Sequence, residues 1–434
     1  MGIILLAGVA LAIIALIHFY LWKRLVRDAT RPGRWRRIGA IAAVVLGLLV
    51  PATLIGTRTG LTVLAWPGYL WIALMFYLLV VLLLLEIPML VTRIVIRRAA
   101  ASDHRAEPHA LTVAGQPTAA RQSAETTGPP VETDQEEERQ NRTATDDAHS
   151  GEEPRPGIER RLLLARGAAI FAGLTAGGIT AYGTRTALGA PRLDRVQITL
   201  AKLPRAMDGF RIATVSDIHL GPLAGRAHTE RIVAAVNRTN ADLVAVVGDL
   251  VDGSVLELGA AAAPLRGLQS RHGSFFVTGN HEYYSGAEEW LAEVERLGIR
   301  TLRNERQLIT GAGGAFDLAG VNDVAGEGTS TGGPDIPGAL RGRDDTIPVV
   351  LLAHQPVQVH DAAEQHVDLQ LSGHTHGGQM VPFNLLVKLD QPIVRGYARF
   401  GDTQLYVTNG AGFWGPPVRV GAPPQVTLVE LRSP

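Results

Sequence analysis

The sequence has 434 residues and contains no cysteine. This absence excludes disulfide bonds, thiolate nucleophiles, and zinc or iron–sulfur sites built from cysteine. It does not fix the redox compartment, because a large domain can be stable in an oxidising space without disulfides. Net charge is also absent: 41 basic residues balance 41 acidic ones. No bulk basic field attracts nucleic acid, so no nucleic-acid partner is expected.

Charged residues are scarce, at 19% of the chain, whereas 46% of the residues are hydrophobic. The hydrophobic excess is local. Apolar runs cover roughly residues 1–22, 38–55 and 67–91, and each is long enough to cross the hydrocarbon core of a bilayer. A cleaved signal peptide would carry its basic residues before its apolar run, but here they follow it. The sequence therefore predicts an all-α region with three retained transmembrane helices in residues 1–98.

Two further segments separate this region from the rest of the chain. Residues 99–159 are polar, acidic and rich in proline and glycine, with almost no large apolar side chains. Such a segment cannot bury enough surface to offset chain entropy, so a disordered linker is expected. Residues 160–185 return to small and apolar side chains after Arg160 and Arg161. They predict a fourth transmembrane helix.

The distribution of arginine predicts the orientation of these helices. The loop between the first two apolar runs is rich in arginine, whereas residues 56–66 carry only Arg58. Basic residues in short loops stay in the cytoplasm. In a bacterial cell membrane, the linker would then be cytoplasmic and everything after a spanning fourth helix would lie outside; without that span the domain would stay inside. Glu86, within the third run, is either a functional residue or a partner of Arg93 or the interface.

Residues 190–434 alternate short apolar runs with segments of helical pattern, expected at 226–237 and 287–297. Apolar runs of this kind predict strands buried on both faces, and their alternation with helices is typical of α/β layering. Five runs end in polar residues. They are "FRIATVSDIHL", "ADLVAVVGDLVDG", "GSFFVTGNHEYY", "IPVVLLAHQP" and "VDLQLSGHTHGG".

The polar residues at these five strand ends are all oxygen or imidazole ligands. Functional residues gather past the carboxyl ends of parallel strands, and two divalent cations about 3.5–4 Å apart need such a set with one bridging member. The glycines of "LSGHTHGGQM" let the chain turn sharply while both imidazoles face one cavity. The candidate residues are Asp217, His219, Asp249, Asp252, Asn280, His281, Glu282, His354, His374 and His376.

The ordered blocks D-x-H, G-D-x-x-D, G-N-H-E, a single H and G-H-x-H resemble the calcineurin-like metallophosphoesterases over residues 196–431. "SGHTHGGQ" and "LYVTNGAGFWGPPVRVGAPPQVTLVEL" are most similar to a membrane-associated or exported bacterial branch, which contains phosphodiesterases and relatives of UDP-diacylglucosamine pyrophosphohydrolases. The resemblance implies a four-layer αββα sandwich and a phosphoester substrate. It does not cover the first 190 residues.

The resemblance also implies a role for each candidate residue. Asp249 would bridge two metal ions, and His281 would stabilise or protonate the transferring phosphate or the leaving group without binding metal. Asp252 and Glu282 would orient imidazoles. Manganese, zinc and iron all suit such ligands. The first ion would take Asp217, His219 and His376, and the second Asn280, His354 and His374.

Together these features predict a membrane-anchored, two-metal phosphoesterase that hydrolyses a phosphodiester or pyrophosphate in a lipid or cell-envelope substrate. The alternatives are a broad-range phosphomonoesterase, and a membrane sensing or scaffold protein that uses the same fold. The complete ligand set favours an enzyme. Arg395 and Arg419 are further candidates for contact with phosphate, and the apolar stretch 380–387 is either core or a surface for acyl chains or bilayer.

Overall fold

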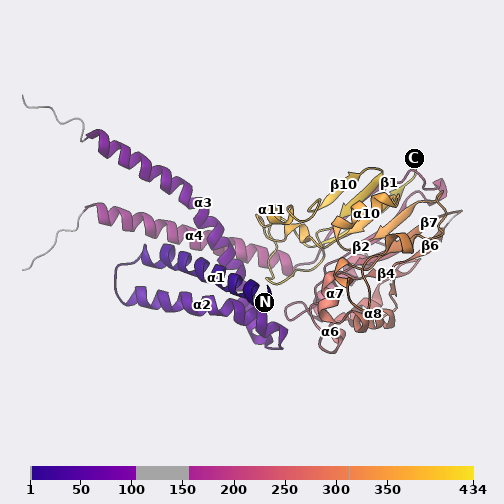
Figure 1. The fold of residues 1–434 in the computed structure, drawn as a ribbon, viewed down its shortest axis with the longest axis horizontal. Coiled ribbons are helices and arrows are strands. Elements are labelled where there is room, and N and C mark those ends of the chain that lie inside the picture. The colour runs from indigo at the N-terminus through magenta and orange to yellow at the C-terminus, as the bar shows by residue number, and fades with distance from the viewer. Residues whose placement is uncertain (1, 104–155, 312) are drawn as a thin grey trace, which may run out of the picture.

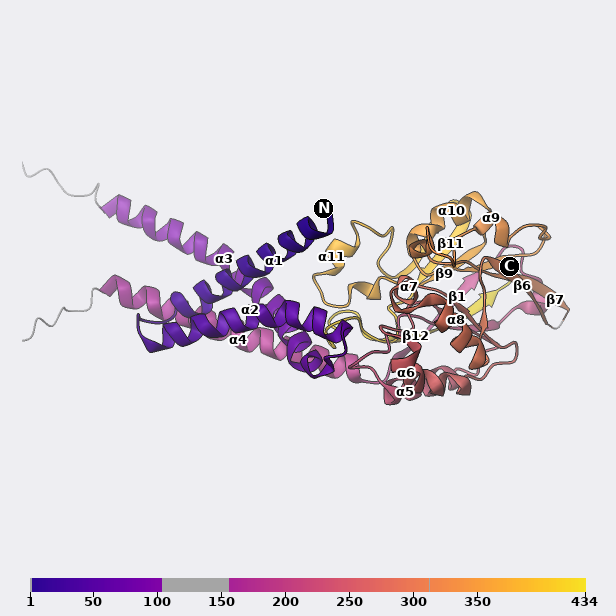
Figure 2. The same ribbon diagram turned by 60° about the horizontal axis from the view of Figure 1, so that its bottom comes forward.

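The computed structural model describes residues 2–103, 156–311 and 313–434. A bundle of long helices lies at one end of the molecule and an α/β domain at the other (Figures 1 and 2). The bundle helices are α1 (Gly2–Leu21), α2 (Arg34–Arg58), α3 (Ala65–Asp103) and α4 (Pro156–Leu188).

Four helical stretches, one along each bundle helix, are long and apolar enough to cross a membrane: Leu5–Arg27, Arg34–Arg58, Thr62–Val91 and Leu162–Leu188. Many of their large apolar side chains face outward. Contact with the acyl chains of a bilayer stabilises such an apolar surface, whereas contact with water does not. The first five and last four residues of the predicted linker extend α3 and α4, and the rest of it, 104–155, lies outside the described residues.

The side chain of Arg93, one predicted partner of Glu86, lies outside the described residues, and Glu86 has other partners among those described. It pairs with Arg24 and accepts a hydrogen bond of 3.0 Å from the Tyr20 hydroxyl, so it joins α3 to the first helical segment. An acidic side chain within an apolar helix is stabilised by such a basic partner. This cluster accounts for Glu86 structurally.

The α/β domain contains two six-stranded sheets. The first has the order β1-β12-β2-β3-β4-β5 and is parallel except where β12 meets β2. Its strands are β1 (Arg192–Thr199), β2 (Phe210–Val215), β3 (Leu243–Val247), β4 (Ser274–Val277), β5 (Arg300–Thr301) and β12 (Gln425–Arg432).

The second sheet has the order β10-β11-β9-β8-β7-β6, with four parallel central strands and an antiparallel strand at each edge. Its strands are β6 (Glu305–Gly311), β7 (Gly314–Gly320), β8 (Val349–Leu352), β9 (Leu369–Ser372), β10 (Gly396–Phe400) and β11 (Thr403–Val407). All five apolar runs that the sequence indicates are strands: β2, β3, β4, β8 and β9.

Three buried clusters show how the layers stack. Phe275 and Phe316, from opposite sheets, belong to the cluster between the sheets. Trp290 of α8 packs in the cluster outside the first sheet, and Ala362 of α10 in the cluster outside the second. The order helices, sheet, sheet, helices confirms the predicted αββα sandwich. The domain helices are α5 (Arg226–Asn237), α6 (Val255–Ala262), α7 (Asn280–Ser285), α8 (Ala287–Arg296), α9 (Ile336–Ala339), α10 (Val359–Glu364) and α11 (Asn384–Val387).

Candidate metal centre

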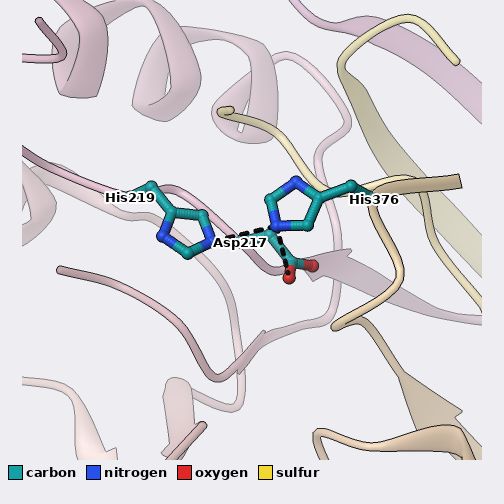
Figure 3. A group of neighbouring side chains, drawn as sticks. All are labelled: Asp217, His219 and His376. Carbon is teal, nitrogen blue, oxygen red and sulfur yellow. Dashed lines mark hydrogen bonds and ion pairs between the residues drawn. The ribbon is translucent and has the colours of Figure 1, made fainter. Parts of the chain in front are cut away.

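Three ligand-type side chains meet where β2 and β9 end, and we call Asp217, His219 and His376 the first ligand group (Figure 3). All three are buried. The Nε2 atoms of the two histidines lie 3.0 Å apart, and His376 Nε2 lies 3.5 Å from Asp217 Oδ1. Two imidazole nitrogens that approach this closely beside a carboxylate form a pocket suited to a cation.

A second cluster of Asp249, His354 and His374 forms beside the first, and we call it the second ligand group. His354 Nε2 lies 3.0 Å from Asp249 Oδ2, in a direction that makes no hydrogen bond. Among the described residues, three buried atoms here have no hydrogen-bond partner: His354 Nε2, His374 Nδ1 and Asn280 Oδ1. Buried polar atoms are normally paired, so these three atoms fit the binding of a cation.

Asp249 lies between the two groups. Its Oδ2 is 3.0 Å from His354 Nε2 in the second group and 3.7 Å from His219 Nε2 in the first. Its Oδ1 accepts a hydrogen bond of 2.9 Å from the backbone N–H of His281. One carboxylate oxygen therefore faces both groups while the other is fixed by the backbone.

The hydrogen bonds behind two imidazoles leave their metal-facing nitrogens available. His354 Nδ1 donates to the carbonyl of Val247 at 2.8 Å, so in the neutral imidazole the lone pair lies on Nε2. Burial would lower the pKa of His354, but the charge of Asp249 raises it well above its usual value, so a cation bound at this nitrogen would displace a proton. His219 Nδ1 lies 2.9 Å from Asp252 Oδ1, which favours the same tautomer. These contacts fit cation binding through Nε2.

Five of the ligand-type residues have left-handed backbone conformations. Asp217, His219, Asp249, His374 and His376 have φ between 48° and 70°. Such angles are costly for residues other than glycine, and they cluster at functional sites where the surroundings hold them. Each places a side chain just beyond a strand end, where a regular extension would point it elsewhere.

Burial and charge control protonation in the two groups. Burial raises the pKa of Asp217. Burial would also raise the pKa of Asp249, but the charge of His354 and their contact hold it well below its usual value. Burial and the charge of His354 lower the pKa of His374 to about 4, so this imidazole stays neutral, the form that binds metal ions.

The two predicted supporting carboxylates differ. Asp252 Oδ1 contacts the Nδ1 atoms of His219 and His281, at 2.9 and 2.6 Å, as expected for a residue that orients imidazoles. Glu282 instead accepts backbone N–H bonds from Asp249, Leu250 and Gly279, at 3.0, 2.7 and 2.6 Å. The expectation that Glu282 orients an imidazole is wrong, because its carboxylate fixes the backbone of the turn that carries Asp249.

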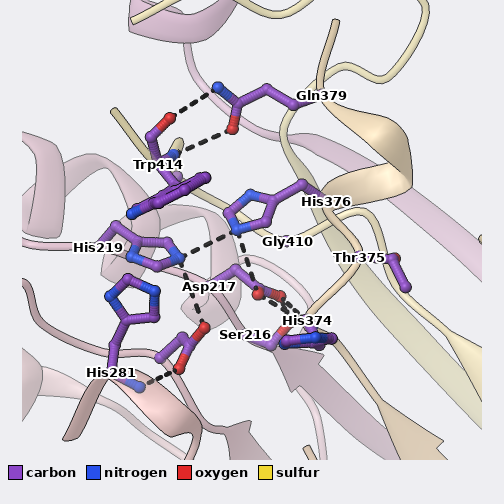
Figure 4. Close-up of polar contacts among 12 residues, drawn as sticks. Ser216, Asp217, His219, His281, His374, Thr375, His376, Gln379, Gly410 and Trp414 are labelled. Atoms are coloured by element: carbon purple, nitrogen blue, oxygen red, sulfur yellow. Dashed lines mark hydrogen bonds and ion pairs between the residues drawn. The ribbon is translucent and has the colours of Figure 1, made fainter. Parts of the chain in front are cut away.

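His281 lies at the side of the first ligand group (Figure 4). Its ring is 4.6 Å from that of His219 and 5.9 Å from the indole of Trp414. His219, Asp252 and His281 also form a third set with ligand-type atoms close together. In this set both imidazoles already have Asp252 as a hydrogen-bond partner, so the contacts resemble a positioning network more than a cation site.

Asp323 is a buried acidic residue near the site that the sequence analysis did not identify. Asp323 is fully buried near the end of β7 and accepts hydrogen bonds from the Ala325 backbone N–H and Gln355 Nε2. Burial raises its pKa. The run "FDLAGVND", which also ends an apolar strand in an acid, could have indicated it.

Arg419, a candidate for contact with phosphate, is fully buried, and its guanidinium is used within the protein. It donates to the carbonyls of Gly412 and Asn409, and to both the carbonyl and the Nδ1 of His376. Arg395 donates to the carbonyl of Gly421 from an exposed position. No sequence signal distinguishes a buried arginine of this kind.

Comparisons with known proteins identify the family of the α/β domain. The family profile described as calcineurin-like phosphoesterase matches residues 210–378. A metallophosphoesterase of Aquifex aeolicus is 33% identical over 247 residues, which are 56% of this chain and 92% of that protein.

Two relatives are longer. A metallophosphoesterase of Helicobacter pylori is 41% identical over 246 residues, 56% of this chain and 65% of that protein. A Danio rerio protein named as a transmembrane protein with a metallophosphoesterase domain is 38% identical over 264 residues, 59% of this chain and 60% of that protein. The chain therefore spans slightly under two thirds of these two relatives.

Proposed function

The chain belongs to the calcineurin-like metallophosphoesterases, and on that premise we propose that it is a membrane-anchored phosphoesterase with two metal ions. Its substrate would be a phosphodiester or pyrophosphate in a lipid or cell-envelope molecule. The first ion would be held by Asp217, His219 and His376, and the second by Asn280, His354 and His374. Asp249 would serve both.

The position of Asp249 carries this proposal. Its Oδ2 lies within 4 Å of an imidazole nitrogen in each ligand group, at 3.7 and 3.0 Å. A single carboxylate oxygen between two nitrogen-rich pockets is the arrangement that two cations about 3.5–4 Å apart require. Nitrogen and oxygen ligands without thiolate suit manganese, iron or zinc.

Bound at these groups, divalent cations would supply Lewis acidity toward phosphate oxygens and toward water. The protein would supply proton transfer. Because His281 Nδ1 is bonded to Asp252 at 2.6 Å, His281 Nε2 is the atom left to donate a proton to the leaving oxygen. Asp252 holds both His281 and His219, so it would align the proton donor with the first ligand group.

The four apolar helices support a membrane anchor, because each has the length and composition of a span. The arginine-rich loop between α1 and α2 would face the cytoplasm. We propose that α4 returns the chain across the bilayer and that the α/β domain lies outside the cytoplasm, where envelope lipids and polymers are its substrates. Protease treatment of intact cells carrying a tag after Pro434 tests this orientation; protection of the tag would contradict it.

The function is tested with the purified full-length protein in detergent. Chelation should abolish hydrolysis of bis(p-nitrophenyl) phosphate, and Mn²⁺ should restore it. Hydrolysis should be faster for this diester than for p-nitrophenyl phosphate. Activity that survives thorough chelation would refute the metal-dependent mechanism, and a preference for the monoester would favour a phosphomonoesterase. A His360→Ala variant, which changes an exposed histidine outside both ligand groups, should behave as the unmodified protein.

A further inference from the structure

An exposed apolar surface lies directly after the loop that carries His374 and His376. We call residues 380–389 the α11 loop, because it contains the short helix α11. Five of its large apolar side chains are between 41% and 83% exposed. Such a concentration on one short segment indicates a surface that is covered in the working protein. The exposed side chains are Val381, Phe383, Leu385, Leu386 and Leu389.

The base of the α11 loop packs against the helical bundle. Met380 and Val420 belong to one apolar cluster with Ala172 and Ala176 of α4, and the backbone N–H of Arg419 donates to the Gly183 carbonyl of α4 at 2.9 Å. Gly183 permits this approach, because a Cβ there would meet Val418 at 2.5 Å. The loop is therefore joined to the end of a candidate membrane span.

Figures 1 and 2 show where this places the loop. In both views, α11 lies between the bundle and the two sheets, at the level of the bundle end that carries the N-terminus of α1. The bundle helices need a bilayer around their outward-facing apolar side chains. A bilayer around the candidate spans would bring the boundary between acyl chains and headgroups to the level of these side chains.

We propose that the α11 loop inserts into the surface of the bilayer that holds the helices, so that the metal centre takes its substrate from that layer. The substrate class is an amphiphile whose phosphoester reaches the ligand groups while its acyl chains remain in the membrane. The substrate assignment rests on the proposed function. Lys388 lies within the loop, where its charge can reach the headgroups while its stem stays in the apolar layer.

The structure gives a short connection from this surface to the metal centre. Gln379, directly before the loop, exchanges hydrogen bonds with the backbone of Trp414 (Figure 4). The Trp414 indole is 52% exposed and 5.9 Å from the ring of His281. Gly415 lies against the Tyr69 ring of α3. Tryptophan is favoured at membrane–water boundaries, where one face is apolar and the other wet.

The insertion is tested first by depth, and the lack of cysteine makes single labelling sites clean. Leu386→Cys and the control Leu308→Cys, 57% and 47% exposed, each receive a nitroxide label in the full-length protein. Leu308 lies on β6, far from the bundle (Figure 1). In phosphatidylcholine–phosphatidylglycerol vesicles, the label at 386 should be more accessible to oxygen than to a water-soluble nickel chelate, and the label at 308 the reverse.

Two results would overturn the insertion. Equal exposure of both labels to the nickel chelate would place the α11 loop in water. Dipolar coupling between 386 labels on two chains would show that a second copy covers the surface instead of lipid.

The second test concerns substrate access. Leu386→Asp should lower hydrolysis of a vesicle-borne phosphodiester lipid, relative to soluble bis(p-nitrophenyl) phosphate, by about tenfold, because it replaces an inserted apolar side chain by a charge. Leu308→Asp should leave this ratio unchanged. An unchanged ratio in Leu386→Asp would refute lipid access through the α11 loop. Absence of hydrolysis of both substrates by the unmodified, metal-loaded protein would instead refute the proposed function.

Discussion

The two ligand groups sit side by side but differ in how their polar atoms are paired. In the first group, His219 contacts Asp252 and His376 contacts Arg419 through their Nδ1 atoms. In the second, among the described residues, His354 Nε2 and His374 Nδ1 have no hydrogen-bond partner. The first group is held by a network of protein side chains, whereas the second leaves buried polar atoms without a protein partner, as fits a bound cation.

The two ligand groups should therefore differ in how their metal affinity responds to substitutions. Substitution of a side chain that hydrogen-bonds to the first group should alter the orientation of its imidazoles, and so the affinity for one ion. Changes at Asp249 remove the side chain that both groups share. Three predictions test this comparison, and a fourth concerns a buried histidine outside both groups.

The largest effect is expected from Asp249→Ala, which should erase the difference between the groups by emptying both. Activity should fall by about 10⁴-fold or more, since cation stabilisation of the transition state contributes several kcal/mol. Metal analysis by mass spectrometry should show loss of both ions. Asp402→Ala, at an exposed turn, is the matched control. Retention of one full equivalent of metal in Asp249→Ala would show that the carboxylate is not shared.

His281→Ala should separate chemistry from metal binding. The imidazole contacts Asp252 and neither group depends on it for a ligand, so both ions should remain. Turnover should fall by about 10²–10⁴-fold, the usual contribution of a positioned proton donor. The loss should be smaller for a substrate with a nitrophenolate leaving group, which needs little protonation. An empty site in this variant would make His281 a ligand.

Asp252→Ala should act on one group alone. Asp252 contacts His219 but no side chain of the second group by a hydrogen bond that the structure describes. The affinity for one ion should fall about 10–100-fold, as is usual when a carboxylate behind a metal-binding histidine is removed. Titration with Mn²⁺ should show one weakened step and one unchanged step. Asp252→Asn keeps a hydrogen-bond acceptor, so its metal affinity should fall less. Equal weakening of both binding steps in Asp252→Ala would contradict the comparison.

The smallest effect concerns a buried histidine outside both groups. Burial and the charge of Arg231 lower the pKa of His228 to about 4. Below pH 6.5 the unfolded chain takes up a proton that the folded one does not, so stability is lost as the pH falls from about 6.5 toward 4. From pH 7 to 5 this amounts to about 2 kcal/mol. The Tm of His228→Gln in detergent should depend less on pH than the Tm of the unmodified protein. An equal dependence of Tm on pH in both proteins would contradict this prediction.

The sequence predicts the strand ends well, because each strand is a continuous apolar run that stops at a polar residue, as at Asp217 and Asp249. It also predicts α5 and α8 closely, from their apolar periodicity. What it cannot predict are contacts that arise from packing. The buried position of Arg419 depends on carbonyl groups gathered from several loops, and no local pattern records that arrangement.

The same limit applies to the supporting residues. A carboxylate a few residues after a strand end is equally suited to an imidazole or to backbone N–H groups, and only the fold decides that Asp252 takes the first and Glu282 the second. From the sequence, the apolar stretch 380–387 is either core or a surface for acyl chains or bilayer. Its exposure follows from its place at the end of the bundle.

Each ligand group draws on both sheets, and this has a consequence for the chain as a polymer. His219 follows β2 of the first sheet and His376 follows β9 of the second, 157 residues away. An ion held between them closes a long loop, as a cross-link would, and the unfolded chain does not assemble these ligands. Binding at 1,000 times Kd would then add about 4 kcal/mol to the free energy of unfolding. The supply of free metal would therefore set how firmly the two sheets are held together, in addition to its proposed role in hydrolysis.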